Sequence, residues 1–238
     1  MRTILNFNEN WQFCLSDSSY ADLMGGSTNW RTLRLPHDWD TEFEPFEDSP
    51  CRGGGGFVKA GIGWYQKEFD LSDFFPSSST DARTYIQFDG IYMDSTIYLN
   101  GQELYHQGYG YSSFQVDLTD YLVEGKNLLV VRVNNSLQPN SRWYSGSGIY
   151  RNTWLLQTAP VHVAYNGVRC ATNAIFYELN MATLQITTAL TNDSRENKTL
   201  NVEKGNGFMQ GIFVEYGITF DDDVTDVRNG GFGSTTKK

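Results

Sequence analysis

The sequence is poor in cysteine and histidine, and the shortage excludes several kinds of reactive site. Three cysteines occur in 238 residues, and Cys14, Cys51 and Cys170 are too widely spaced to form a CxxC pair. Neither a zinc site nor a dithiol redox centre is therefore indicated. The three histidines do not lie at metal-ligand spacing from one another. No nucleophile elbow, phosphate-binding loop or dinucleotide fingerprint is present either, so the sequence indicates no metal and no cofactor.

Basic residues and long apolar runs are also scarce. The chain has 18 Lys and Arg against 28 Asp and Glu, a formal net charge of −10. This balance argues against nucleic acid, whose phosphates attract Lys and Arg, and against an anionic membrane surface. No apolar run approaches the length of a membrane span. No apolar stretch follows Arg2, so no secretory signal is expected, and with the free thiols this favours a cytoplasmic location.

Aromatic residues, by contrast, are abundant, at 15% of the chain. One interpretation is a β-rich core, because aromatic side chains favour strands. The other is carbohydrate binding, in which the apolar faces of sugars stack on aromatic rings. Composition leaves both open, and the net charge is easiest to reconcile with a neutral ligand.

The hydrophobic pattern is almost entirely that of β-strands. Asn100-Gly101 lies between two short apolar runs, which is the strongest local signal for a hairpin. Asp117 is expected to cap one short helix, Leu118–Leu122. Without alternation of strands and helices, an all-β sandwich or jelly roll is predicted. The expected strands are Ala82–Phe88, Thr96–Leu99, Gln102–Gln107, Ser113–Asp117, Asn127–Val133 and Arg151–Gln157.

A domain boundary is predicted near Thr158–Pro160. Further strands, Val161–Asn166 and Thr183–Thr191, then open a second sandwich. From about residue 203 the alternation is lost apart from Ile212–Phe220. We therefore expect a first domain at 1–158, a partial immunoglobulin-like sandwich at 159–202, and a poorly ordered tail at 203–238 that limited proteolysis would remove.

Several motifs, in conserved order and spacing, resemble those of family 2 glycoside hydrolases of the β-galactosidase type. Leu35–Trp39 resembles LPHDW, Gly63–Phe69 resembles GWYRKxF, and the most specific run is Ser141–Arg151, SRWYSGSGIYR. The resemblance covers residues 4–158 strongly and 159–202 moderately. Other matching segments are Phe88–Gly90, Leu99–Gly101, Gly108–Thr119 and Gly125–Val133.

This resemblance implies a galactose-binding-domain-like jelly roll, then an immunoglobulin-like sandwich, then a catalytic TIM barrel. In the family, two glutamates of the barrel act as acid/base and nucleophile. Such a barrel takes about 250 residues, and about 158 of this chain are assigned to the jelly roll. We therefore expect the barrel to be absent from this sequence, no catalytic residue to lie in it, and the chain to be inactive alone.

Arg142, Trp143 and Tyr144 are the best candidates for binding substrate. They lie in a polar connection between two predicted strands, and a guanidinium beside aromatic rings suits sugar hydroxyls and C–H faces. In the family this connection borders the pocket that the barrel completes. Some members carry an Asp contact where Arg142 falls and an Asn contact where Ala60 falls. The alternative is that both rings pack under the Gly146–Gly148 turn.

Other polar clusters are interpreted as structural. His37 and Asp38 are adjacent in an extended segment and therefore point to opposite faces, which makes a poor dyad. Asp38 is expected to bond nearby backbone and Trp39 to lie in the core. Arg52–Gly56 has no following helix to make a phosphate site. Arg151 is expected to brace the loop, and the acidic run 221–223 to be a solvated turn.

The predicted function is that of a non-catalytic N-terminal domain, which supplies one wall of a sugar pocket in a β-galactosidase-like enzyme. A stand-alone carbohydrate-binding module is one alternative, since jelly rolls also serve lectins. A truncated product without its own function is another. The start of a second sandwich favours the first hypothesis over the stand-alone module.

Overall fold

A computed structural model describes residues 2–26, 28–77, 79, 81–176 and 181–194. By its internal contacts the chain divides into residues 1–198 and 199–238. The second unit, with the predicted tail and the Ile212–Phe220 strand, lies outside the described residues.

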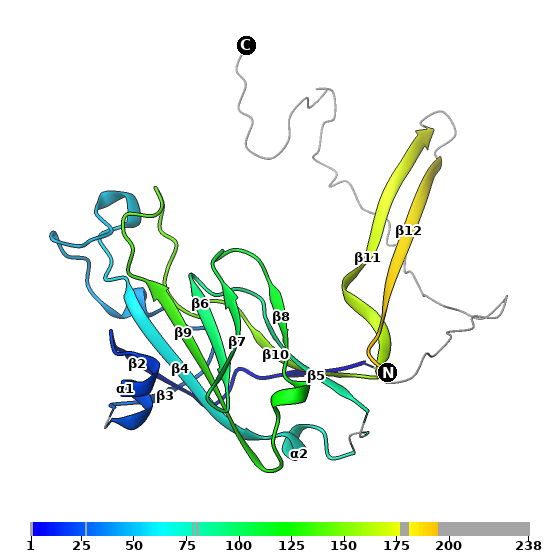
Figure 1. The fold of residues 1–238 in the computed structure, drawn as a ribbon. Helices are drawn as coiled ribbons and strands as arrows, with labels where there is room; N and C mark the ends of the chain where they lie inside the picture. Colours follow the sequence, from blue (N-terminus) through cyan, green and yellow to red (C-terminus); the bar gives the residue numbers. More distant parts are fainter. Residues whose placement is uncertain (1, 27, 78, 80, 177–180, 195–238) are drawn as a thin grey trace. The chain divides into compact units, whose positions relative to one another are not determined.

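Two antiparallel sheets face each other in the first unit (Figure 1). The smaller sheet has the order β1-β10-β5-β8. The larger has the order β3-β2-β4-β9-β6-β7. The bounds are β1 Arg2–Asn6, β2 Trp11–Leu15, β3 Arg31–Leu33, β4 Gly61–Asp70, β5 Arg83–Phe88, β6 Ser95–Leu99, β7 Gln102–Gln107, β8 Phe114–Asp117, β9 Lys126–Asn135 and β10 Thr153–Thr158.

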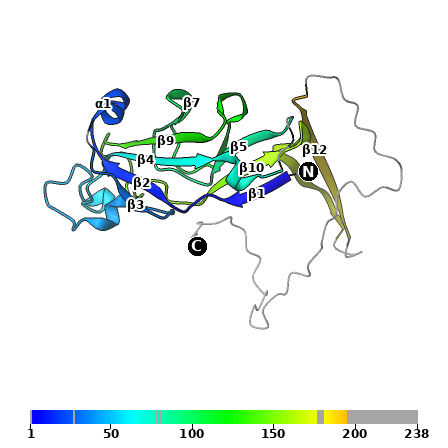
Figure 2. The same ribbon diagram turned by 90° about the horizontal axis from the view of Figure 1, so that it is seen from below.

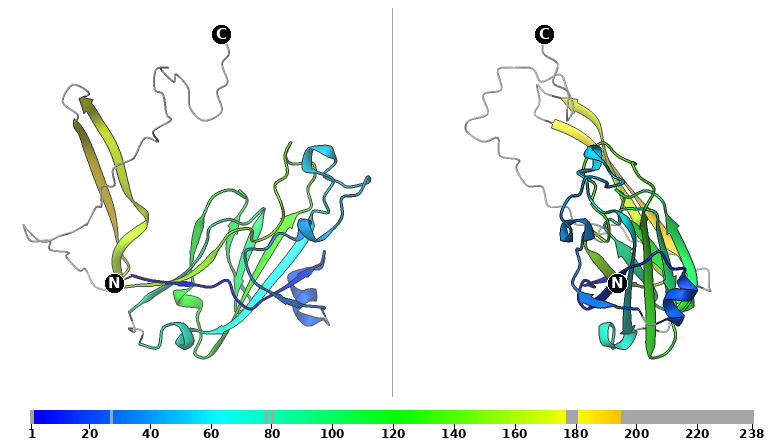
Figure 3. Two further views of the ribbon diagram at one scale, coloured as in Figure 1. Left: turned by 180° about the vertical axis from the view of Figure 1, so that it is seen from behind. Right: turned by 90° about the vertical axis from the view of Figure 1, so that its left-hand side faces the viewer.

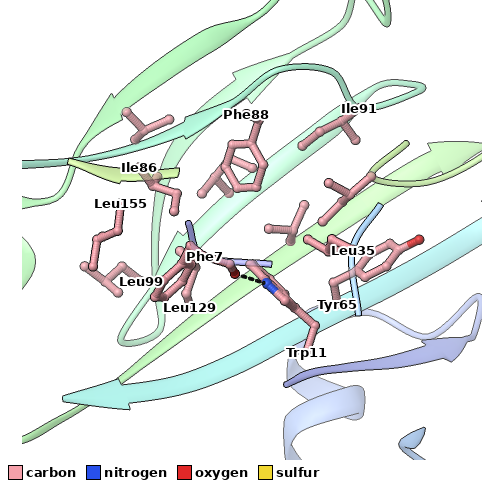
Figure 4. Close-up of a cluster of buried hydrophobic side chains, with 14 of the residues drawn as sticks. Phe7, Trp11, Leu35, Tyr65, Ile86, Phe88, Ile91, Leu99, Leu129 and Leu155 are labelled. Carbon is pink, nitrogen blue, oxygen red and sulfur yellow. Dashed lines mark hydrogen bonds between the residues drawn. The ribbon is translucent and has the colours of Figure 1, made fainter. Parts of the chain in front are cut away.

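The core lies between the sheets. Ile86, Phe88 and Leu155 point inward from the smaller sheet, and Tyr65 and Leu129 point inward from the larger one (Figure 4). All five side chains are 0% exposed. Burial of this apolar surface is the main force that holds the two sheets together. The prediction of an all-β sandwich is confirmed.

Strand β9 is buried on both faces, as its continuous apolar run NLLVVRV predicts. It lies between β4 and β6 in the larger sheet. Leu129 and Val131 face the main core, whereas Val130 packs on the outer face with Trp64 and Leu23. Leu23 comes from the short helix α1, Tyr20–Gly25, which lies beside β2 (Figure 2).

The predicted helix Leu118–Leu122 is wrong in type and length. The segment forms a single 3₁₀ turn, Thr119–Tyr121. Asp117 does accept a hydrogen bond from the backbone N–H of Thr119, at 2.9 Å. The eight residues between β8 and β9 are too few to propagate an α-helix, so the turn stays in the tighter form. The Asn100-Gly101 hairpin is present, with φ of +51° and +85°.

After Pro160 the chain forms an antiparallel pair, β11 (Val161–Phe176) and β12 (Met181–Asn192). Among the described residues, the only α-helix besides α1 is the short α2, Leu71–Phe74. No helix in this part of the chain is long and apolar enough to span a bilayer.

Candidate functional site

Two loops meet at one end of the sandwich. One precedes β4 and contains the 3₁₀ turns Trp39–Glu42 and Gly53–Gly55; the other connects β9 to β10 (Figures 1 and 3). A methyl group on Gly54 would lie 3.4 Å from the carbonyl oxygen of Ser141. One on Gly56 would lie 3.7 Å from the ring of Tyr144. The glycine-rich segment therefore packs against the loop that carries the predicted binding residues.

Asp38 ties the two loops together. Its Oδ1 accepts hydrogen bonds from the backbone N–H groups of Ser147, at 2.8 Å, and Asp40, at 3.1 Å. Its Oδ2 accepts one from the hydroxyl of Tyr144. Gly146 makes this approach possible, because its φ is +71° and a methyl group there would lie 2.5 Å from Oδ2. The prediction that Asp38 bonds backbone is confirmed.

A second carboxylate, Asp40, supports the β9–β10 loop from below. Asp40, Ser147 and Asn135 are at most 2% exposed. The Ser147 hydroxyl donates to Asp40 Oδ2 at 2.5 Å, and Asn135 Nδ2 donates to Ser147 Oγ at 2.7 Å. Burial raises the pKa of Asp40, and hydrogen bonds from Ser147 and the Ala60 N–H oppose that rise. Because each member is paired, this buried network is a rigid base for the loop.

His37 belongs to a separate cluster. Its Nδ1 lies 2.7 Å from the Tyr65 hydroxyl and its Nε2 lies 3.0 Å from Glu42 Oε1. Arg31 donates to both oxygens of Glu42. Burial lowers the pKa of His37, and the hydrogen bond that Glu42 accepts from the imidazole opposes this shift. The imidazole therefore pairs with Glu42 rather than with Asp38.

Trp39, as predicted, lies in the core. It is 0% exposed, and its Nε1 donates to the carbonyl of Ala60 at 3.0 Å. This contact places the backbone of Ala60 against the 3₁₀ turn, so that the Ala60 N–H can donate to Asp40 at 2.8 Å. The tryptophan therefore links the core to the network under the loop.

The three predicted binding residues lie together on the outer part of the β9–β10 loop. Arg142 is exposed, and within the described part of the chain it has no ion pair. Trp143 is 60% exposed and Tyr144 is 48% exposed. Packing of both rings under the Gly146–Gly148 turn, the alternative considered from the sequence, is therefore not observed. Trp143 Nε1 donates to the hydroxyl of Tyr111 at 2.9 Å.

The loop also borders a depression that sequence reasoning did not find. Its volume is about 440 Å³, and none of the three predicted residues lines it. Arg151, which we expected to brace the loop, is exposed. Its Cζ lies 5.8 Å from the centroid of the Tyr150 ring. The lining residues are Pro36, Asp89, Ser113, Tyr150, Arg151 and Asn152.

The described residues contain no group of three or more His, Cys, Asp or Glu side chains that could hold a metal ion. The carboxylates of Asp38 and Asp40 accept hydrogen bonds from the loop itself, which is a structural use. The chemistry available on the outer surface is that of a guanidinium, hydroxyls and aromatic rings. These groups suit non-covalent recognition of a polyhydroxylated ligand.

The fold and site define an antiparallel β-sandwich module that carries a polar, aromatic surface on loops at one end. Residues 56–160 match the family described as "Glycosyl hydrolases family 2, sugar binding domain". The chain belongs to this family, and it corresponds to the N-terminal sugar-binding region of its members.

Named relatives and a solved structure agree with this family assignment. The chain is 42% identical over 199 residues to the β-galactosidase BoGH2A of Bacteroides ovatus, covering 83% of this chain and 23% of that protein. It is 40% identical to a putative β-glucuronidase of Formosa agariphila, covering 71% and 16%. A β-glycosidase from Bacteroides vulgatus superposes with a TM-score of 0.71 at 34% identity, covering 82% and 25%. The chain thus spans a quarter or less of the length of these relatives.

Proposed function

We propose that this chain supplies one wall of a sugar pocket that a catalytic barrel completes, with Arg142, Trp143 and Tyr144 facing the sugar. The observation that carries the proposal is the contrast between the two sides of one loop. Its inner side is fixed by the buried Asp40–Ser147–Asn135 network, while its outer side leaves a cation and two aromatic rings exposed. Preorganised groups of this kind bind with little loss of conformational entropy.

The proposed ligand is a β-galactoside-like carbohydrate. The relatives support this class, because BoGH2A is named a β-galactosidase and others are named β-glucuronidases. The barrel would contribute the acid/base and the nucleophile. This division of labour is why we propose a binding role, rather than a catalytic one, for residues 1–158.

We infer the same domain order as from the sequence: a jelly roll at 1–158 and the first part of an immunoglobulin-like sandwich at 159–202. The β11–β12 pair supports the second part of this inference, since it begins directly after Pro160. A stand-alone carbohydrate-binding module would have no use for a barrel. The DNA downstream of Lys238 discriminates between these two hypotheses, because an adjacent reading frame that encodes a barrel favours the proposal.

The test is Arg142→Ala in a chimera in which this chain replaces the matching region of BoGH2A. We expect kcat/KM for nitrophenyl β-galactoside to fall by the equivalent of about 1.5 to 3 kcal/mol, because a charge-assisted hydrogen bond to the sugar or to a catalytic carboxylate is lost. Arg34→Ala is the control. Arg34 pairs with exposed Glu9 on the surface, where an ion pair contributes little.

An unchanged kcat/KM in the Arg142→Ala chimera would show that Arg142 does not contact the ligand and that the loop only packs against its neighbours. A large fall in Tm would indicate the same, because it would show that Arg142 supports the fold rather than the ligand.

A further inference from the structure

Next to the proposed sugar wall, three aromatic side chains stay exposed on neighbouring loops. Tyr109 is 63% exposed, Tyr111 41% and Trp143 60%. Tyr109 and Tyr111 come from the β7–β8 connection, and Trp143 comes from the β9–β10 loop. Exposed aromatic side chains that gather in one place are unusual on a soluble domain and mark a binding surface.

The three rings are connected to one another. Trp143 Nε1 donates to the Tyr111 hydroxyl at 2.9 Å, which joins the two loops. The ring centroids of Tyr109 and Tyr111 lie 5.7 Å apart. Beneath them, Tyr92 is 4% exposed, and its ring centroid lies 5.2 Å from that of Tyr111. Tyr111, to which the other two side chains are joined, therefore packs against a buried ring.

The turn that carries the two tyrosines is also held in place. Gly110 lies so close to Tyr92 that a methyl group on it would be 2.3 Å from the ring. The Tyr150 hydroxyl donates to the carbonyl of Gly110 at 2.9 Å. Gln107 Nε2 donates to the carbonyl of Tyr109 at 3.2 Å. These contacts orient the turn, so its rings are presented outward without the need to reorganise on binding.

We propose that Tyr109, Tyr111 and Trp143 form a stacking platform that binds further sugar residues of a neutral oligosaccharide, beyond the one in the pocket. The inference rests on the proposed function, since Trp143 belongs to both surfaces. Aromatic rings with hydroxyl or indole N–H groups match the alternating apolar faces and hydroxyl edges of a sugar chain. None of the three side chains is charged, and the net charge of −10 disfavours an anionic chain.

The experiment compares galactose with β-1,4-galactotetraose as ligands of the full chain, by NMR titration of the tryptophan indole N–H signals. The Trp143 signal is assigned by its loss in Trp143→Phe. We expect the tetraose to bind at least about fivefold more tightly than galactose, which corresponds to one aromatic contact. The Trp143 signal should shift with the tetraose, because this indole lies in the platform.

The double variant Tyr109→Ala/Tyr111→Ala should lose the preference for the tetraose. Tyr121→Ala is the matched control, since this tyrosine is 42% exposed on a different turn. If the double variant does not fold, Tyr109→Ala alone removes the most exposed ring, and Tyr111→Phe removes only the acceptor of the Trp143 N–H. Both should then lower the preference.

Equal affinities for the two sugars, no binding of the tetraose, or a preference that survives in a folded double variant would each overturn the platform. The proposed pocket is judged separately by the Arg142→Ala chimera with nitrophenyl β-galactoside, whose single sugar does not extend to the two tyrosines of the platform. The platform can thus fail while the pocket stands. A preference for the tetraose together with an unchanged kcat/KM in the Arg142→Ala chimera would mean that the platform stands and the proposed pocket fails.

Discussion

Lys67 is the most unusual single residue of the sandwich, because it places an ammonium group inside the core. It is 7% exposed, and its Nζ lies 3.6 Å from the centroid of the Phe7 ring and donates to the Phe7 carbonyl at 3.1 Å. Burial lowers its pKa from 10.5 to about 8. The carbonyl and the ring offset only part of the cost of removing the charge from water.

The depressed pKa predicts a rise in stability on the alkaline side. Between pH 8 and pH 10 the unfolded chain keeps the lysine proton, whereas the folded chain has released it. The free energy of unfolding therefore rises by up to about 1.4 kcal/mol per pH unit, with Lys67 as the source. Urea unfolding at pH 7 and pH 9.5 measures the rise.

Lys67→Met is the matched variant for this measurement. It keeps the length of the side chain, and the Phe7 carbonyl still accepts from Trp11 Nε1 at 2.8 Å. The free energy of unfolding of Lys67→Met should not show the rise with pH that Lys67 causes in the unsubstituted chain. Identical pH profiles for the two proteins would show that Lys67 remains charged in the folded chain.

Tyr144→Phe isolates the bond from the binding loop to Asp38. The ring is kept and only the hydroxyl is removed, while Asp38 still accepts from the N–H groups of Ser147 and Asp40. We expect a loss of about 1 kcal/mol in the free energy of unfolding, the typical net value of one hydrogen bond. Urea denaturation measures it, with Tyr121→Phe as the control; equal effects of the two changes would show that the Asp38 bond contributes nothing.

At the scale of the element, the β9–β10 loop depends on the backbone of one glycine. Gly146→Ala should destabilise the protein by about 2 to 3 kcal/mol, because the added methyl group collides with Asp38 and the residue must keep a positive φ. Gly125→Ala is the control. Gly125 has φ +80° but no atom within 4 Å of the added methyl group, so its cost should be only about 1 kcal/mol.

The difference between these two variants, measured by urea unfolding, reports the contact with Asp38 rather than backbone strain. If Gly146→Ala costs no more than Gly125→Ala, then the loop tolerates movement away from Asp38. In that case the bonds from Tyr144 and Ser147 are not what holds the loop.

Helices were harder to predict than strands. The capping signal of α1 is present in the sequence, since Ser19 is followed three residues later by Asp22, and Ser19 Oγ accepts from the Asp22 N–H at 3.2 Å. The helix is only six residues long and buries one side chain, Leu23. The helical pattern of apolar residues therefore does not repeat often enough to be distinguished from the loops around it. The helix prediction for Leu118–Leu122 failed for a different reason. A good capping residue was present, but too few residues followed it to form an α-helix.

At the scale of the whole molecule, we predict that this chain alone hydrolyses no glycoside. A retaining glycosidase holds two carboxylates about 5 to 5.5 Å apart, and a barrel that positions them takes about 250 residues. The Asp38 and Asp40 carboxylates already accept hydrogen bonds from the loops. Purified chain should therefore leave nitrophenyl β-galactoside, glucoside and glucuronide intact.

A turnover that survives repurification, and that disappears when a carboxylate within residues 1–238 is substituted, would contradict this prediction. Activity that appears only on addition of a separately expressed barrel would agree with it, because the chain would then act as one half of a divided enzyme.

The sequence by itself determined the class of fold, the family and six of the ten strands of the sandwich, β5 to β10, whereas β1 to β4 were not among the predicted strands. Alternation, Asn-Gly turns and motifs such as SRWYSGSGIYR are local signals, and each can be read within a dozen residues. The position of Arg142, Trp143 and Tyr144 on a connecting loop was likewise evident from the strands on either side. Their role as sugar contacts remains a proposal.

Only the tertiary structure decided which distant residues meet. Asp38 bonds Ser147 across 109 positions, and Trp143 reaches Tyr111 across 32. No local pattern records these pairs, because they arise where two sheets bring separate loops to the same end of a sandwich. The polar network under the loop and the aromatic platform beside it are therefore products of packing, whereas the strands that carry them follow from the order of residues along the chain.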